Sequence, residues 1–76
     1  MSPRLPRVTG AQLMHALYRG GWQVKRQTGG HVQLAHLERP GLVTLPLHSG
    51  ETLKEWIVKS VLKQAGLTVE DLKELL

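Results

Sequence analysis

A histidine that directly follows two glycines is the residue of this chain best suited to chemistry. His31 comes after Gly29 and Gly30 and opens a short run in which apolar and polar residues alternate. Histidine takes and gives a proton near neutral pH, and the glycines allow a tight turn with open space beside it. We expect His31 to act as a general acid or base, although a solvated histidine at the start of a strand would have the same sequence.

Basic residues accompany this histidine. Lys25 and Arg26 precede the glycine turn, and Lys59 and Lys63 lie four apart in a later helical segment, on one face of that helix. Such side chains bind the phosphates of nucleic acids, and the backbone amides of a glycine turn are additional donors. We therefore predict six residues that bind nucleic-acid phosphates, RNA or DNA: Lys25, Arg26, Gly29, Gly30, Lys59 and Lys63.

The other histidines are weaker candidates for catalysis. His48 could supply a second proton, hydrogen-bond to its own loop or contact a protein partner. His36 lies five residues after His31, so a strand would direct it to the opposite face, where we expect a structural residue. His15 lies away from the apolar face of its helix and is expected in solvent.

A metal centre is a poorer interpretation of these histidines. His31, His36 and His48 could together hold zinc, but they include no helical pair four residues apart, and two of the three would face opposite ways. We therefore predict no metal and no other cofactor.

Aromatic residues are scarce: two tryptophans, one tyrosine and no phenylalanine. Either tryptophan could stack on a nucleobase. In so small a domain a tryptophan more often anchors the core, and we expect this of Trp22. The role of Trp56 stays open.

Composition limits the class of protein. The chain has 76 residues, of which 41% are hydrophobic, and it has no cysteine, which excludes disulfides and thiolate zinc sites. Its net charge is +4, and residues 1–37 carry five basic side chains and no acid. This charge fits RNA or DNA as a partner, and it fits equally well a charge that serves only solubility. It has no apolar run of 18 residues and no signal-peptide pattern, so we expect a cytoplasmic protein without membrane contact.

The elements that position these residues follow from periodicity. Residues 1–8 are predicted to form a basic extended arm, and residues 9–76 a single domain. Thr9 and Gln12 form a capping box that starts a helix, and Gly20-Gly21 ends it. Three short strands follow, over residues 22–27, 31–37 and 42–45, with turns at 28–30 and 38–41.

Two helices complete the predicted order. The first is expected to begin at Thr52, with Glu55 at the capping-box position, to bury Leu53, Ile57, Val61 and Ala65, and to end at Gly66. Thr68 caps the second, short helix. Three antiparallel strands and two amphipathic helices predict an α+β two-layer sandwich, with one face of the sheet open to a partner.

Several motifs in this order resemble a known family. They are Gly-Gly-Trp after the first helix, Val-Lys-Arg-Gln-x-Gly-x-His, Leu-Pro-Leu-His after the third strand, and Leu-Lys-Gln-Ala-Gly-Leu-Thr-Val-Glu-Asp-Leu near the end. Over residues 9–76 the chain resembles the HicA toxins, mRNA interferases of type II toxin–antitoxin systems. The resemblance implies a double-stranded-RNA-binding-domain-like α-β-β-β-α fold with a short C-terminal helix.

The resemblance also implies roles for particular residues. His31 matches the catalytic histidine of the family's Gly-Ser-His signature, in which Gly30 here replaces the serine, and His48 matches the histidine of a Val-Pro-x-His pattern. Glu55-Trp56-Ile57 replaces a frequent Pro-Gly-Thr, which lengthens the helix. The implied activity is metal-independent endoribonuclease cleavage of mRNA, neutralised by a HicB-like antitoxin. A non-catalytic RNA-binding module and a protein that only binds an antitoxin-like chain are the alternatives.

Overall fold

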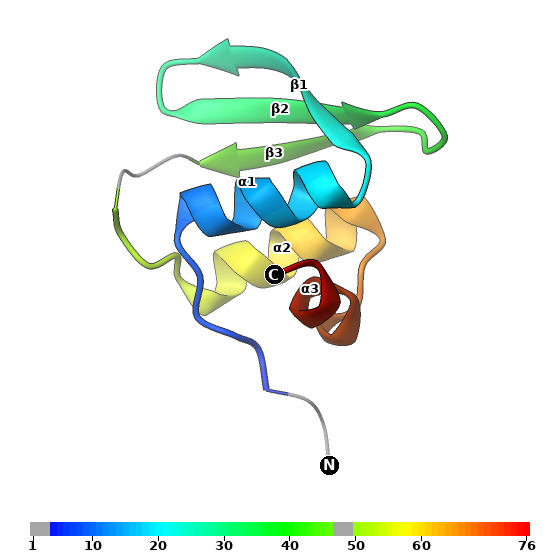
Figure 1. Cartoon of the computed structure of the whole chain (residues 1–76). Coiled ribbons are helices and arrows are strands. Elements are labelled where there is room, and N and C mark those ends of the chain that lie inside the picture. The colour runs from blue at the N-terminus through cyan, green and yellow to red at the C-terminus, as the bar shows by residue number, and fades with distance from the viewer. Residues whose placement is uncertain (1–3, 47–49) are drawn as a thin grey trace.

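The computed structural model describes residues 4–46 and 50–76. Along the chain lie α1 (Gly10–Arg19), β1 (Trp22–Thr28), β2 (His31–His36), β3 (Leu42–Pro46), α2 (Glu55–Ala65) and α3 (Val69–Leu75). Figure 1 shows the sheet above a layer formed by α1 and α2, with α3 beside the helices. This arrangement confirms the predicted α+β fold with its short C-terminal helix.

The three strands form an antiparallel sheet in the order β1-β2-β3, as predicted. One face of the sheet packs on the helices, because alternate residues of β2 and β3 are apolar and fully buried. The core consists of aliphatic side chains and one tryptophan: Val8, Leu13, Ala16, Leu17, Trp22, Val32, Leu34, Val43, Leu45, Leu53, Val58, Val61, Leu62, Ala65 and Leu72.

The first helix starts and ends as its sequence predicts. The Thr9 side chain accepts from the Gln12 backbone N–H, and the Gln12 side chain accepts from the Thr9 N–H, which completes the capping box. Gly21, with φ of +96°, turns the chain from α1 into β1. An ideal Cβ there would lie 2.5 Å from Nε2 of His36, so this position requires glycine for its conformation and for space.

The second helix begins later than predicted. Its N-cap is Lys54, which makes no side-chain capping bond, and Glu55 is its first residue. The expected start at Thr52 is wrong because Thr52 forms a β-bridge with Thr9, and the Leu53 N–H donates to the Val8 carbonyl over 2.8 Å. These contacts hold residues 52–53 in an extended conformation that a helix cannot share.

The buried face of α2 differs accordingly from the predicted stripe. Val61 and Ala65 are buried as expected, whereas Ile57 is only partly buried and Leu53 reaches the core from the segment before the helix. The helix also buries residues outside the four-residue repeat, Val58 and Leu62. A strict repeat of four residues drifts round a helix that has 3.6 residues per turn, so the face toward the core takes Val58 and Leu62 as well, and Ile57 falls at its border.

Polar contacts secure the ends of the helices. Gly66 ends α2 in the left-handed conformation, and Arg39 from the β2–β3 turn donates to the Ala65 carbonyl over 3.0 Å. Thr68 and Asp71 form the capping box of α3. Hydrogen bonds with Thr68 lower the pKa of Asp71, and the bond from the Thr68 backbone N–H has a larger effect than the bond with its side chain. Arg19 donates to the Leu75 and Leu76 carbonyls, which joins α1 to the end of α3.

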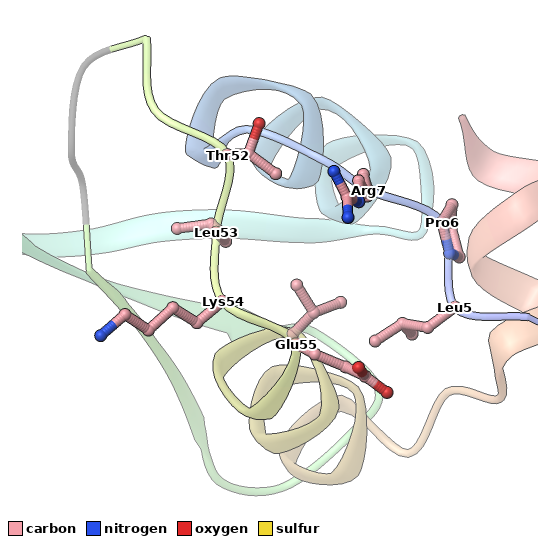
Figure 2. A pocket seen from close by; sticks show the side chains of 8 residues that line it. Leu5, Pro6, Arg7, Thr52, Leu53, Lys54 and Glu55 are labelled. Carbon is pink, nitrogen blue, oxygen red and sulfur yellow. The ribbon is translucent and has the colours of Figure 1, made fainter.

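Within the described part of the N-terminal arm, apolar residues pack against the body of the molecule. Val8 is buried and Leu5 is partly buried against the core. Between the arm and the start of α2 lies a hollow of about 280 Å³, in which Leu5 and Glu55 extend toward each other while Lys54 points away (Figure 2). Within residues 4–46 and 50–76, no helix has the length and apolar character needed to cross a membrane.

Candidate functional site

The face of the sheet that points away from the helices carries His31. Paired residues on neighbouring strands share a face, and Val32, Leu34, Val43 and Leu45 occupy the buried one. Their neighbours along each strand therefore lie on the other face. From the register, this open face bears Gln23, Arg26, Thr28, His31, Gln33, Ala35, Leu42, Thr44 and Pro46.

A β-bulge in β1 brings Arg26 onto this face. Val24 pairs with Leu34 on the buried side, and strict alternation would return Arg26 to that side as well. The register instead shifts between Val24 and Arg26, so that Lys25 and Arg26 together oppose one residue of β2. Arg26 pairs with Gln33, two residues from His31 along the same strand.

His31 is exposed and lies at the end of the sheet where the glycine turn enters β2. It pairs with Thr28 on one side and with Pro46 on the other, while Gly29 forms the preceding turn with φ of +55°. Among the residues that the structure describes, no side chain or backbone group hydrogen-bonds its imidazole. Because the side chain is exposed, a ligand can reach it from the open side.

A groove of about 420 Å³ lies beside His31. His31, Thr44 and Pro46 of the sheet form one wall, and α2 forms the other with Trp56, Ile57, Ser60, Val61 and Gln64. The two walls are joined where the Thr44 N–H donates to Oε1 of Gln64 over 2.9 Å. This bond satisfies a backbone N–H on the outer edge of β3 and links the sheet to α2 at that point.

The predicted basic residues are distributed over two surfaces. Arg26 shares the sheet face with His31, and Lys25 lies at the bulge. Lys59 lies on α2, 3.1 Å from Glu55 in an exposed ion pair. Lys63 lines a separate hollow that also includes Arg39. Neither lysine lines the His31 groove, although both lie on the helix that forms its outer wall.

The remaining histidines have different positions. His36 is half-buried and packs edge-on against Trp22, with ring centroids 5.3 Å apart. The Glu38 N–H donates to its Nδ1 over 3.0 Å, so Nε2 carries the proton and donates to the Gly20 carbonyl. His15 is exposed on α1. The prediction for His48 falls on a residue outside the described ranges.

These positions agree with the expectations from the sequence. His36 is structural, His15 is exposed to solvent, and Trp22, which is 2% exposed, lies in the core. His31 and His36 lie on opposite faces of the sheet, as their spacing predicts. In the described part of the chain, no three side chains of histidine, cysteine, aspartate or glutamate come together as metal ligands do.

Sequence reasoning missed most of the groove. Trp56, Ser60 and Gln64 follow one another at intervals of four residues, which puts them on one face of α2. That spacing was available in the sequence, and with it a mixed polar and aromatic face. Nothing local to α2 shows, however, that this face meets the edge of β3 beside His31.

Comparison with known protein families gives a match over most of the chain. The model of the HicA toxin of bacterial toxin–antitoxin systems matches residues 10–67, from the first residue of α1 through the end of α2, and thus includes the sheet, the glycine turn and His31. No individual curated protein matches the chain. The family model covers well over half of the chain and the whole two-layer fold, and the chain therefore belongs to the HicA toxin family of bacterial toxin–antitoxin systems.

Proposed function

We propose that this toxin is an endoribonuclease that cleaves mRNA, with His31 exchanging the proton of the reaction. The observation that carries the proposal is the position of His31: exposed, without a hydrogen-bond partner in the described residues, and on the same sheet face as Arg26. Family membership supports the same conclusion, because HicA toxins act within toxin–antitoxin systems. Cleavage of mRNA is the activity that the resemblance to this family implies.

RNA supplies its own nucleophile. The 2′-oxygen attacks the adjacent phosphorus and gives up its proton, the bond from phosphorus to the 5′-oxygen breaks, and the leaving 5′-oxygen takes up a proton. His31 is proposed to act as the base or the acid in this exchange, and Arg26 to stabilise the charge that develops on the phosphorane. The products are a 2′,3′-cyclic phosphate and a 5′-hydroxyl, and no metal is needed to generate the nucleophile.

Other predicted residues have supporting roles in this proposal. The backbone amides of Gly29 and Gly30 would receive a phosphate oxygen at the turn, and Lys25, Lys59 and Lys63 would hold flanking phosphates. His48 is the candidate for the second proton-transfer group. A HicB-like antitoxin is proposed to neutralise the toxin by covering the open face of the sheet that bears His31.

Replacing His31 tests the catalytic assignment. Because one general acid or base contributes about 100- to 10,000-fold to a rate, His31→Ala should lower RNA cleavage by that factor and abolish growth arrest on induction. His15→Ala is the matched control, since His15 is an exposed histidine on the opposite layer. Circular dichroism of both variants checks that the fold is retained.

The outcomes separate the candidate functions. Cleavage by His31→Ala at the wild-type rate would refute the assignment. Products that end in a 3′-hydroxyl, formed only with magnesium, would refute the metal-independent reaction. Wild-type protein that binds RNA and arrests growth without cutting it would indicate the non-catalytic RNA-binding module. Co-expression of His31→Ala with a HicB-like protein, followed by purification of the complex, tests the partner.

A further inference from the structure

Trp56 lines the groove beside His31, and its side chain is not part of the hydrophobic core. The indole is 68% exposed, whereas the other tryptophan, Trp22, is 2% exposed and packs in the core. The buried side of α2 consists of Val58, Val61, Leu62 and Ala65. Because Trp56 contributes little to burial, its large flat surface is available to a ligand in the groove that it lines with His31.

Hydrogen bonds within the groove fix which of its polar groups donate and which accept. The Thr44 N–H donates to Oε1 of Gln64, which fixes the orientation of that amide, and Nε2 of Gln64 donates to Oγ of Ser60 over 3.2 Å. The Ser60 hydroxyl accepts this bond, so its own proton remains for donation, as does the second proton on Nε2 of Gln64. The groove therefore offers hydrogen-bond donors to an acceptor on its occupant.

An aromatic surface, an apolar floor and fixed donors together suit a flat ring with acceptor atoms. Ile57 and Val61 supply the floor, and the volume of about 420 Å³ is within the usual range for small-ligand sites, about 300–1,000 Å³. Unpaired RNA bases are recognised in this way, by stacking on an aromatic side chain and hydrogen bonding to the base edge. The neighbouring His31 and the positive charge of the chain favour an RNA occupant.

We propose that this groove is a nucleobase subsite. Trp56 stacks on an unpaired base next to the phosphodiester held at His31, and Ser60 and Gln64 donate hydrogen bonds to acceptor atoms on that base. The subsite selects single-stranded RNA and biases the nucleotide at which the toxin cuts. This inference rests on the proposed ribonuclease function, because it takes the scissile phosphate to lie at His31.

Binding to a non-cleavable RNA tests the subsite independently of catalysis. The probe is a fluorescein-labelled single-stranded oligonucleotide, 2′-O-methylated throughout so that the nucleophile is blocked, and the readout is anisotropy. Loss of one base–aromatic stack weakens binding by about 5- to 150-fold, and Trp56→Ala should show that loss. Trp56→Phe, which keeps a stacking ring, should recover most of it.

Two further measurements sharpen the test. Tyr18→Ala is the matched control, because Tyr18 is a 43% exposed aromatic residue on α1, outside the groove, and its loss should leave the affinity unchanged. Ser60→Ala should change the preferred nucleotide at the cut site when products from a random RNA pool are sequenced. Quenching of Trp56 emission by the same oligonucleotide should accompany binding to the wild-type protein.

The outcomes distinguish this inference from the proposed function. If His31→Ala abolishes cleavage while Trp56→Ala keeps the wild-type affinity and cut sites, the subsite is refuted and the ribonuclease stands. If His31→Ala still cleaves, the proposed function fails, and an unchanged affinity of Trp56→Ala would refute the base contact as well. Loss of antitoxin binding by Trp56→Ala, with RNA affinity intact, would assign the groove to the protein partner and overturn the proposal.

Discussion

Arg26 lies on the same sheet face as His31 because β1 contains one extra residue at its bulge. The bulge between Val24 and Arg26 makes two consecutive basic residues oppose Gln33, so the strand presents adjacent positive charges next to the glycine turn. A phosphate bound between His31 and Arg26 would contact one proton-transfer group and one permanent charge. The proposed chemistry requires this pair.

The contribution of Arg26 can be measured through the salt dependence of binding. Arg26→Gln should weaken binding to a single-stranded RNA severalfold and reduce the slope of log K against log salt by about 0.7, the value for one phosphate contact on a single strand. Lys73→Gln is the control, because it removes the same charge from α3 and leaves the sheet unchanged. Equal effects of the two substitutions would show that only net charge matters and would contradict a local contact at Arg26.

Among the elements, the link between α1 and β1 is the most constrained. Gly21 adopts φ of +96° and approaches the His36 ring, which is itself held by Glu38, Gly20 and Trp22. His36 thus ties the end of β2 to the end of α1. The role of this histidine is to position the two layers, and it leaves the open face of the sheet to His31.

Two glycine substitutions separate strain from crowding at this link. Gly21→Ala should lower the free energy of unfolding by about 3 kcal/mol, since positive φ alone costs a non-glycine residue about 1–2 kcal/mol and the new Cβ also meets the His36 ring. Gly29→Ala should cost only the conformational part, because a Cβ there has no atom within 4 Å. Urea unfolding followed by circular dichroism measures both. Equal losses would show that the His36 contact contributes nothing.

At the scale of the whole molecule, the first half of the chain is basic, whereas the segment after residue 50 is nearly balanced, with five acids and four lysines. The basic residues of the first half include Lys25 and Arg26 of β1, whereas five of the six acids follow residue 50. A negatively charged RNA is therefore attracted to the sheet side, which carries His31. An antitoxin that covers this face would remove the same attraction.

Val8, the last residue of the predicted arm, belongs to the core of the fold. Val8 is 2% exposed and its carbonyl accepts from the Leu53 N–H, which sets where α2 begins. Val8→Ala should lower the free energy of unfolding by about 2 kcal/mol through lost burial and the remaining cavity. This is a large share for a domain of 76 residues. Leu37→Ala, at a 95% exposed site, should change it by less than about 0.5 kcal/mol in the same urea titration.

The sequence alone determined the local features of this protein. Capping boxes at Thr9 and Thr68, the glycine that ends α2 and the alternation in β2 and β3 depend on residues only a few positions apart. They sufficed to predict the fold class, and the short motifs around His31 sufficed to indicate the family, to which the chain indeed belongs.

Only the tertiary structure decided the features that depend on distant segments. The start of α2 is set by the bridge from Thr52 to Thr9, the position of Arg26 by the pairing of β1 with β2, and the groove by the bond from Thr44 to Gln64. In each case a backbone group finds its partner 7 to 43 residues away in sequence, where hydrophobic periodicity carries no information about register. Thus His31 was evident from its neighbours in the chain, whereas Arg26 and Trp56 became its neighbours only through folding.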